Sequence, residues 1–564
     1  MNAGSLAHPN PDFHFALRER RFVLAFGAIV MLLTTLPYLS GYAAQGEAFR
    51  FSGFVFGVED GNSYVAKMLN GWTGDWSFKT PYTAYPQNGL FYYLPYLLLG
   101  KLAAPPGLHE QLVAIYHTFR IGAGLLAILA SYDFLSRFII RRRLRAFCLA
   151  LITLGGGLGW LIVLAGRTGW MGSLPLDFFS PEAFGFLTLF GLPHLAAARA
   201  LMLWALLAYL DLVASLQKGP YPGEGEATRV TARLGAFWFL AGIFQPLTLA
   251  IVGAVIAVHL IGLAVRQLFN HLRHREQAAL SWLRLLACLI AAGLLPAASL
   301  VYSFLVSQFD SFARAWTSQN LIRSPNFVHY LLAYGLLIPF AWSGGRWLLR
   351  QNFTLGWLPV GWVLVFPLLA YAPLDLQRRL TEGVWAAWCV LAFAVLDRQA
   401  DYQNASKRRD WSFAPLVLAF PSTVILLLGG FMAARRAAPP LFLPAAKTAT
   451  FLALQAREFH GDVVLASYET GNSFPAWAPV QVLVGHGPES IFQADLLPRI
   501  NAFYQSTTPD ERRQELIEQF GIKYIFWGPE ERRLGDWQPG SADFVRLFVR
   551  HGEYALYRVT GAEQ

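Results

Sequence analysis

Long apolar runs recur along most of the chain and end near residue 433. Most of them approach the about 20 residues that an α-helix needs to cross the hydrocarbon core of a bilayer. The hydropathy rule predicts about eleven membrane-spanning helices. We place them at residues 22–40, 111–136, 146–166, 183–216, 234–247, 249–266, 283–306, 328–345, 355–371, 382–397 and 412–433. The pattern is typical of a mainly α, polytopic membrane protein.

The fifth and sixth runs are one continuous apolar stretch with Pro246 near its middle. Proline interrupts a helix, so the stretch is either a tight hairpin or one kinked helix. A hairpin leaves "RRRLR" at 141–145 and "KRR" at 407–409 on the same side as the N-terminus. Cytoplasmic loops carry the excess of Lys and Arg. We therefore favour the hairpin, a cytoplasmic N-terminus in the plasma (inner) membrane and an extracytoplasmic C-terminal region.

Beyond the apolar runs the pattern changes to short strands alternating with helices. "DVVLASY", "VQVLVGH", "IKYIFWG" and "EYALYRV" are expected to be strands, and "ESIFQADLLPRINAFYQ" and "TPDERRQELIEQF" helices, the second capped by its Thr. Such alternation predicts a small α/β domain. The expected domains are a cytoplasmic tail (1–21), a transmembrane domain (22–433) with its first outer loop at 42–110, a linker (434–450) and an extracytoplasmic α/β domain (451–564).

Composition supports a membrane protein and argues against a nucleic-acid partner. Hydrophobic residues make up 55% of the chain and charged residues only 14%, against about 25% charged in soluble domains. The net charge is +10, yet residues 440–564 hold 11 Lys and Arg against 15 Asp and Glu. The positive charge therefore belongs to the membrane part, where it sets topology in the lipid bilayer.

The first outer loop carries the first candidate chemistry. "VFGVEDGNSYVAKM" at 55–68 places two adjacent acids, Glu59 and Asp60, just beyond the first span. The rest of the loop is too aromatic and apolar for disorder. Its "LFYYLPYLLLGKLA" is too short to span and is expected to lie in the membrane interface.

The loop as a whole is similar to that of a known enzyme class. An acid precedes a tyrosine by four residues (Asp60 and Tyr64), followed by "NGWTGDW", "TPYTAYPQNG" and "LFYYLPYLLLG". With the helix "YHTFRIGAGLLAILASYDFLSRFI", these segments resemble the GT-C class of glycosyltransferases, in particular the protein O-mannosyltransferase and aminoarabinose-transferase branch. The resemblance covers the membrane part of the chain.

The resemblance implies sugar transfer from a polyprenyl-phosphate donor to a lipid, glycan or protein acceptor at the outer face. By it, Asp60 lies near the acceptor and the anomeric carbon, and a single displacement with Asp60 as base inverts that carbon. The class often has Asp-Glu here, whereas this chain has Asp60-Gly61 with Glu59 one position earlier. Two hypotheses follow: Glu59 replaces the second acid as a weaker helper, or activity has been lost.

Transfer also needs groups that bind the departing phosphate. Arg378 and Arg379 are adjacent on the outer side, and arginine binds phosphate through two parallel hydrogen bonds. Arg120 lies near the outer end of its helix, where a charge is a functional hypothesis by default. The further candidates for substrate or phosphate contact are His194, Tyr64 and Lys79.

Other interpretations of these residues stay open. Arg378 and Arg379 could pair with Asp375 or Glu382, Arg120 with an inner acid, and His194 could be a packed histidine. A divalent metal is left open as a cofactor, with Asp177 and Glu182 as weak candidate ligands, since hard cations need several oxygens. The rival function is a non-catalytic GT-C-like protein or a transporter of a lipid-linked substrate. A transporter would show internal repeats, and no two matching halves are present.

Overall fold

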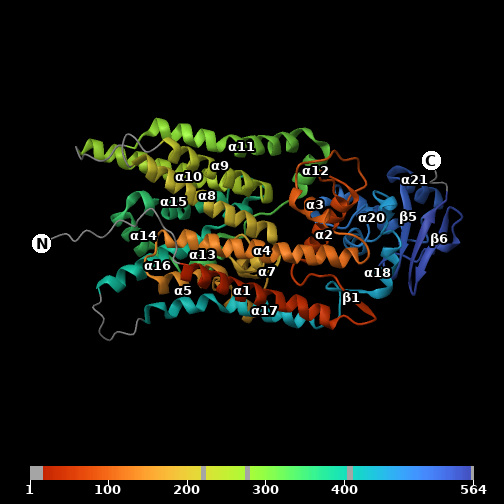
Figure 1. The fold of residues 1–564 in the computed structure, drawn as a ribbon. Helices are drawn as coiled ribbons and strands as arrows, with labels where there is room; N and C mark the ends of the chain where they lie inside the picture. The colour runs from red at the N-terminus through yellow and green to blue at the C-terminus, as the bar shows by residue number, and fades with distance from the viewer. Residues whose placement is uncertain (1–16, 218–223, 274–279, 403–410, 561–564) are drawn as a thin grey trace.

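The computed structural model describes residues 17–217, 224–273, 280–402 and 411–560. Residues 1–16 of the expected cytoplasmic tail and the "KRR" at 407–409 lie outside these ranges. The molecule is elongated, with a helical bundle at one end and a C-terminal domain with a β-sheet at the other (Figure 1). The fold is therefore mainly helical with a small α/β domain, as the sequence predicts.

Within the described residues, eight helices are long and apolar enough to cross a membrane, or nine if one bent pair is a single span. The bent pair is α13 (Phe327–Tyr334) and α14 (Ile338–Gln351), which meet at 72°. The eight are α1 (Leu17–Ala44), α4 (Leu108–Ser136), α8 (Pro193–Gln217), α10 (Leu247–Leu272), α11 (Trp282–Phe309), α15 (Phe353–Ala370), Gln377–Asp397 and Ala414–Ala434. The last two contain α16 (Val384–Tyr402) and α17 (Pro421–Ala434).

Two of the about eleven predicted spans do not qualify. The stretch at 146–166 is broken into α5 (Arg142–Leu154) and α6 (Gly159–Leu164) by consecutive glycines at 155–157, which weaken a helix. The stretch at 234–247 falls in α9 (Glu224–Phe244), whose first half carries charged residues. Because α9 ends before Pro246 and α10 begins after it, the chain does break where the hairpin was predicted.

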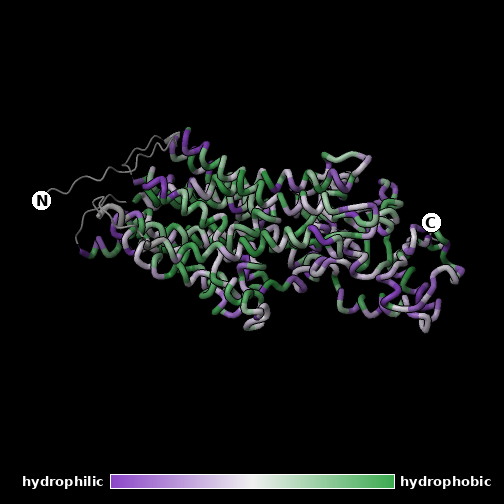
Figure 2. Tube along the Cα trace, turned by 90° about the horizontal axis from the view of Figure 1, so that it is seen from below, coloured by the Kyte–Doolittle hydropathy of each residue, from purple (hydrophilic) through white to green (hydrophobic). Residues whose placement is uncertain are grey.

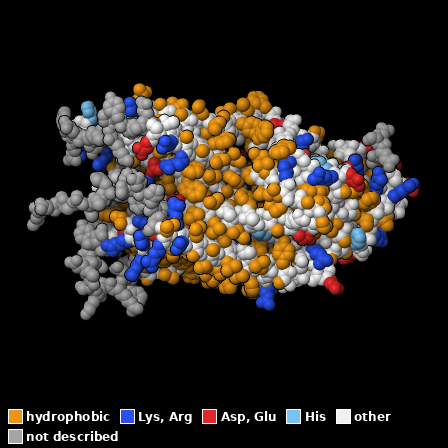
Figure 3. Space-filling view, viewed as in Figure 1, with side chains coloured by type: hydrophobic (Ala, Val, Ile, Leu, Met, Phe, Trp, Pro, Cys, Tyr) orange, Lys and Arg blue, Asp and Glu red, His pale blue; other side chains and the backbone are white. Residues whose placement is uncertain are grey.

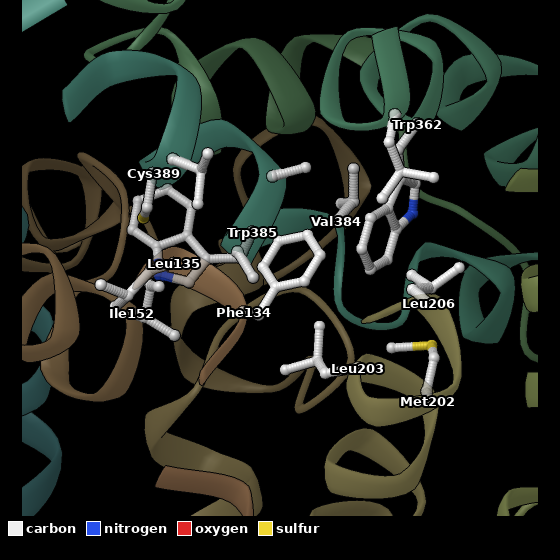
Figure 4. Close-up of a cluster of buried hydrophobic side chains, with 14 of the residues drawn as sticks. Phe134, Leu135, Ile152, Met202, Leu203, Leu206, Trp362, Val384, Trp385 and Cys389 are labelled. Atoms are coloured by element: carbon white, nitrogen blue, oxygen red, sulfur yellow. The ribbon is translucent and has the colours of Figure 1, made fainter. Parts of the chain in front are cut away.

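The interior of the bundle is filled by large apolar side chains from helices distant in sequence. In Figure 4, Phe134 and Leu135 of α4 lie beside Leu203 of α8 and Trp385 of α16. Such burial is worth about 1.5–3 kcal/mol for each large side chain in water, and in a bilayer close packing contributes instead.

An apolar band covers the middle of the visible face of the bundle (Figure 3). Figure 2 shows hydrophobic residues through the length of the bundle and hydrophilic residues toward both ends of the molecule. On the face in Figure 3, hydrophobic side chains cover the middle, and Lys and Arg gather toward the end opposite the C-terminal domain. This is the surface expected of a protein that lies in a bilayer.

The first outer connection is folded rather than a loop. It contains α2 (Val58–Thr73) and α3 (Leu94–Gly100), and places Glu59 and Asp60 in the first turn of α2. The two helices pack backbone to backbone, because a Cβ at Gly71 would lie 2.0 Å from the carbonyl oxygen of Leu97. A closely packed helix pair therefore replaces the expected loop.

The C-terminal domain contains a five-stranded mixed sheet with the order β4-β3-β5-β7-β6. Its strands are β3 (Val463–Leu465), β4 (Gln481–Val482), β5 (Ile522–Trp527), β6 (Val545–His551) and β7 (Tyr554–Val559), and its main helices α18 (Ala445–Leu452), α19 (Tyr468–Ser473), α20 (Gln493–Phe503) and α21 (Asp510–Phe520). The sequence missed β6, and the expected Thr508 cap is wrong, because Thr508 donates to the Ala502 carbonyl instead. The domain is tied to the first connection by β1 (Phe49–Phe51), which pairs antiparallel with β2 (Phe442–Pro444).

Candidate functional site

A cavity of about 340 Å³ lies where the helical bundle, the first outer connection and the C-terminal domain meet. Its walls come from the start of α2, the start of α8, the short helix Gln377–Thr381, the end of α12 (Ser311–Gln319) and the segment 486–489 of the C-terminal domain. Its polar lining comprises Asp60, Ser63, Tyr64, Tyr93, Glu182, His194, Gln245, Gln319, Asn320, Arg378, Arg379, His486 and Glu489. It therefore joins Asp60, Tyr64, Glu182, His194, Arg378 and Arg379, all of which the sequence singled out.

Asp60 enters the cavity from the first turn of α2. The helix starts after Gly57, whose positive φ of 58° suits glycine. Acids in a first turn are favoured by the helix dipole. The Asp60 side chain keeps 57% of its surface accessible, because the cavity rather than packed protein lies in front of it.

Gly61 stands where the resembling class often has a second acid, and the structure shows why an acid does not fit. A Cβ at Gly61 would lie 2.3 Å from the buried ring of Phe54. Glu59 does not take over that place in the cavity, since its Oε1 accepts from the Tyr468 hydroxyl and the Gly487 N–H. Within this cavity, Asp60 is thus the carboxylate that α2 supplies.

The C-terminal domain supplies a histidine and a second carboxylate. His486 Nε2 lies 3.2 Å from Asp60 Oδ1. Glu489 accepts from buried Lys67 at 2.7 Å and from Thr80 at 2.5 Å. Aspartate, histidine, glutamate and lysine thus form one network across the junction, with two acidic and two basic side chains.

The network keeps Asp60 ionised. The protein around the cavity withdraws Asp60 from bulk water, which by itself would raise the pKa of this carboxyl. The hydrogen bond from His486 and the charges of His486, Arg379 and Lys67 outweigh burial, so the pKa of this carboxyl lies below its ordinary value. At neutral pH Asp60 is an anion that can accept a hydrogen bond from a hydroxyl group.

Arg378 and Arg379 form the cationic wall. The Nε atom of each lies 3.9 Å from the Glu182 carboxylate, beyond hydrogen-bonding distance. Nε of Arg378 is buried and, among the described residues, has no hydrogen-bond partner. Two guanidiniums against one acid leave a net positive charge facing the cavity.

A second arginine-glutamate pair holds this wall in place. Arg199 Nε donates to Glu382 at 2.5 Å, next to the segment that carries Arg378 and Arg379. Its other nitrogens donate to the carbonyls of Phe184 and Pro181, on either side of Glu182. Arg199 therefore fixes both sides of the wall and is not itself in the lining.

His194 and Tyr64 form the wall that faces the bundle. His194 Nδ1 is 2.8 Å from the Tyr96 hydroxyl, and the Tyr64 ring stacks on the Tyr96 ring with centroids 4.7 Å apart. Both side chains are thereby oriented toward the cavity.

Three other sequence candidates lie elsewhere. Arg120 is fully buried and donates to Thr34, Thr35 and the Leu189 carbonyl, joining α1, α4 and α7 (Phe186–Gly191). Lys79 is exposed outside the lining. Asp177 is buried and accepts from Ser422 and the Gly159 N–H. Across the part of the chain that the structure describes, no three His, Cys, Asp or Glu side chains cluster as metal ligands.

The sequence missed Lys67, His486 and Glu489. A signal for Lys67 existed: Asp60, Ser63 and Lys67 are spaced as one face of a helix, while Val65, Met68, Leu69 and Trp72 are buried on another. For His486 no such signal existed, since it lies 426 positions from Asp60 in the chain.

Comparison with known proteins identifies the fold of the chain that forms this cavity. No protein-family model and no curated protein sequence matches the chain. The oligosaccharyltransferase of Archaeoglobus fulgidus, tethered with an acceptor peptide, matches with a TM-score of 0.55 at 14% identity over 91% of this chain and 69% of that one. The chain has the GT-C fold. It is a multi-pass membrane protein of that architecture.

Two further structures agree with this assignment of the GT-C fold. The oligosaccharyltransferase AglB of Archaeoglobus fulgidus, in complex with an inhibitory peptide and a dolichol-phosphate, matches with a TM-score of 0.54 at 14% identity over 91% of this chain and 70% of that one. The mycobacterial arabinofuranosyltransferase AftD matches with a TM-score of 0.53 at 16% identity over 96% of this chain and 41% of that one. At these identities the likeness concerns the fold.

Proposed function

We propose that this GT-C protein transfers a sugar from a polyprenyl-phosphate donor to an acceptor hydroxyl at the extracytoplasmic face. One observation carries the proposal: an ionised carboxylate and two guanidiniums without hydrogen bonds to described residues share one cavity at the end of the bundle. The GT-C fold of the chain and the dolichol-phosphate in one neighbour support a lipid-linked donor.

The charges fit the reaction. A polyprenyl-phosphate sugar is a phosphodiester with one negative charge, which suits two arginines offset by Glu182. The acceptor oxygen forms a bond to the anomeric carbon as the bond from that carbon to the phosphate oxygen breaks. The electron pair of the broken bond stays on the phosphate, which gains a second negative charge, and the guanidiniums stabilise it.

Asp60 takes the acceptor proton. Because its pKa is low, it accepts a hydrogen bond from the hydroxyl in the ground state, and the proton moves as the new bond makes that oxygen acidic. Attack opposite the leaving phosphate inverts the anomeric carbon. Glu59 contacts the C-terminal domain instead, so we assign it a supporting role at the junction.

The orientation of the protein belongs to the same proposal. Placing the cavity and the C-terminal domain outside puts "RRRLR" at the cytoplasmic end, in agreement with the positive-inside rule. The donor lipid would then present its phosphate at the outer end of the bundle.

The experiment uses the full chain in lipid nanodiscs with a panel of undecaprenyl-phosphate sugars and labelled transfer as readout. Asp60→Asn should lower transfer by about 10²–10⁴-fold while undecaprenyl phosphate still binds. Asp133→Asn, in the bundle far from the cavity, is the control. Undiminished transfer by Asp60→Asn would rule out Asp60 as the base. Lipid movement without sugar transfer by the unsubstituted protein would favour a transporter.

A further inference from the structure

We propose that His486 is a positioning residue for Asp60, and that the C-terminal domain thereby completes the active site. The inference rests on the proposed function, because it concerns the same carboxylate. The two side chains come from parts of the chain 426 positions apart and lie 3.2 Å from each other.

His486 is held so that one nitrogen faces Asp60. Its backbone N–H donates to Ser490 Oγ at 3.1 Å, and the N–H of Gly485 donates to the same oxygen at 2.9 Å. The imidazole packs against the Tyr82 ring, with centroids 5.4 Å apart. Because an ionised carboxylate can only accept, Nε2 carries the hydrogen that is donated to Asp60. Nδ1 lies 3.6 Å from Glu489 Oε1 and, among the described residues, has no hydrogen-bond partner.

Helix α2 fixes the other end of this arrangement. Glu489 is 2% exposed and accepts from Lys67 at 2.7 Å and from Ser63 at 3.1 Å. Asp60, Ser63 and Lys67 follow one another on one face of α2. The helix that carries the base thus also anchors the segment that orients it.

A third element holds the same segment from the bundle. Gln319 at the end of α12 donates to the Ser490 carbonyl at 3.1 Å and accepts from the Phe492 N–H at 2.7 Å. The segment 486–492 is therefore fixed by α2 and by α12 at once. Movement of the C-terminal domain would displace His486 from Asp60.

The charged groups that face the imidazole are Asp60 and Lys67 from α2 and Glu489 from its own segment. Two carboxylates against one ammonium favour the imidazolium over burial, so the pKa of His486 lies above its ordinary value. A cation hydrogen-bonded to Asp60 restricts its rotation and keeps it ionised. Without the cation, the carboxylate is free to turn toward Arg379, whose charge also reaches it.

The test compares His486→Ala and His486→Gln in the full chain in nanodiscs, using whichever undecaprenyl-phosphate sugar is transferred. His486→Ala should lower kcat by about 10–100-fold, leave the KM for the donor within about twofold, and move the acidic limb of the pH profile to higher pH. His486→Gln keeps an N–H donor and should recover most of kcat.

His460→Ala is the matched control. His460 also joins the C-terminal domain to the first connection, with Nε2 3.4 Å from Asp75 Oδ2, but it lies outside the cavity. The His460→Ala variant should keep the kcat and the pH profile of the unsubstituted protein. An equal loss in His460→Ala and His486→Ala would show that only domain docking matters and would overturn the proposal.

A second measurement does not need transfer. A water-soluble carbodiimide reacts with protonated carboxyl groups, and mass spectrometry of peptides reports the labelling of Asp60 against pH. In His486→Ala, labelling of Asp60 should extend to higher pH, with Glu59 in the same peptide as the internal reference. An unchanged Asp60 profile would overturn the proposal.

The two proposals fail in different ways. If Asp60→Asn keeps full transfer, the proposed function is wrong and the role of His486 is wrong with it. If Asp60→Asn abolishes transfer while His486→Ala keeps the kcat and pH profile of the unsubstituted protein, the proposed function stands and only the inference about His486 fails.

Discussion

Two cavities of similar size, each lined by arginines and acids, lie at opposite ends of the bundle. The first, of about 340 Å³, holds Asp60, Arg378 and Arg379. The second, of about 390 Å³, is lined by Arg20, Asp133, Ser136, Arg137, Trp204, Leu207, Ala208, Asp211, Arg233 and Phe237. Asp133 lies at the far end of α4 from His109, which bonds to the C-terminal domain at Ala476.

The cavities differ in how their charges are paired. In the second, Asp211 binds both Arg137 and Arg233 directly, and Asp133 accepts from Trp204 at 2.9 Å. In the first, the Nε atoms of both arginines stay 3.9 Å from the carboxylate of Glu182. Saturated ion pairs hold helices together, whereas guanidiniums without hydrogen bonds remain available to an anion. The residue types that line a cavity therefore do not show by themselves whether it binds a ligand or only holds helices together.

The largest expected difference between the cavities is in catalysis. Asp60→Asn should reduce sugar transfer by about 10²–10⁴-fold, because the amide cannot accept the acceptor's proton. Asp133→Asn keeps an oxygen for Trp204 and should leave transfer unchanged. Initial rates of labelled transfer measure both. Equal transfer rates for Asp60→Asn and Asp133→Asn would show that the two cavities do not differ in catalysis.

The next largest is in phosphate binding. Replacing Arg378 and Arg379 together by Gln should weaken undecaprenyl phosphate binding by about 10–100-fold. Hydrogen bonds to a charged group are worth about 1.5–3 kcal/mol each, and the N–H donor that Gln keeps at each position recovers part of this loss. Arg323→Gln is the control, because Arg323 is 69% exposed and 3.8 Å from Asp375. Native mass spectrometry in detergent gives the affinities. Unchanged binding in the double variant would place the phosphate elsewhere.

For the stability of the fold, we expect a substitution in the second cavity to have the larger effect. Asp211→Asn leaves Arg137 and Arg233 facing each other without their shared acid and should lower the free energy of unfolding by about 1 kcal/mol, since these side chains are partly exposed. Arg379→Gln removes one of two adjacent positive charges and should not destabilise. Thermal unfolding midpoints in one detergent compare them. A larger decrease in the unfolding midpoint for Arg379→Gln than for Asp211→Asn would show that the first cavity stabilises the fold, which contradicts this prediction.

The smallest effect is on pH dependence at the junction. Lys67 and His486 outweigh burial and hold the pKa of Glu489 below its ordinary 4.5, so its contribution to stability is present above pH 4.5 and is lost as pH falls through that lowered pKa. The pKa of His486 is raised, so its contribution is full below pH 6.5 and is lost as pH rises through the raised pKa. Both contributions are full between pH 4.5 and pH 6.5, so the junction should be most stable in that range.

Hydrogen exchange of the segment 485–490, corrected for the intrinsic pH dependence, measures this effect. Exchange should increase modestly on the alkaline side. The segment around Asp211 should not respond there, because arginine stays charged. Equal responses at both ends would contradict the assignment of the titrating groups.

The sequence predicted the fold class and most of the charged groups that meet in the cavity. Apolar runs of spanning length report directly on helices in a bilayer, which is why most spans are where the pattern placed them. Asp60, Arg378 and Arg379 were identified because a charge next to an apolar helix needs an explanation.

The rest depended on packing between distant segments. Gly61 looked like the loss of an acid, yet Phe54 occupies the space that a side chain would need. The helical spacing of Val65, Met68 and Trp72 could have identified α2, but the segment lies in a long connection after the first span, where the apolar pattern predicts a loop. The contact of His486 with Asp60 exists only once the C-terminal domain docks on α2.

The central claim is that this cavity binds the lipid phosphate beside Asp60. A structure of the protein with undecaprenyl phosphate in a nanodisc tests it most directly. The account predicts the phosphate within hydrogen-bonding distance of the Arg378 and Arg379 guanidiniums, on the side of the cavity that faces Asp60. A phosphate bound at the other end of the bundle, or outside the cavity with Arg378 and Arg379 still unoccupied, would contradict it.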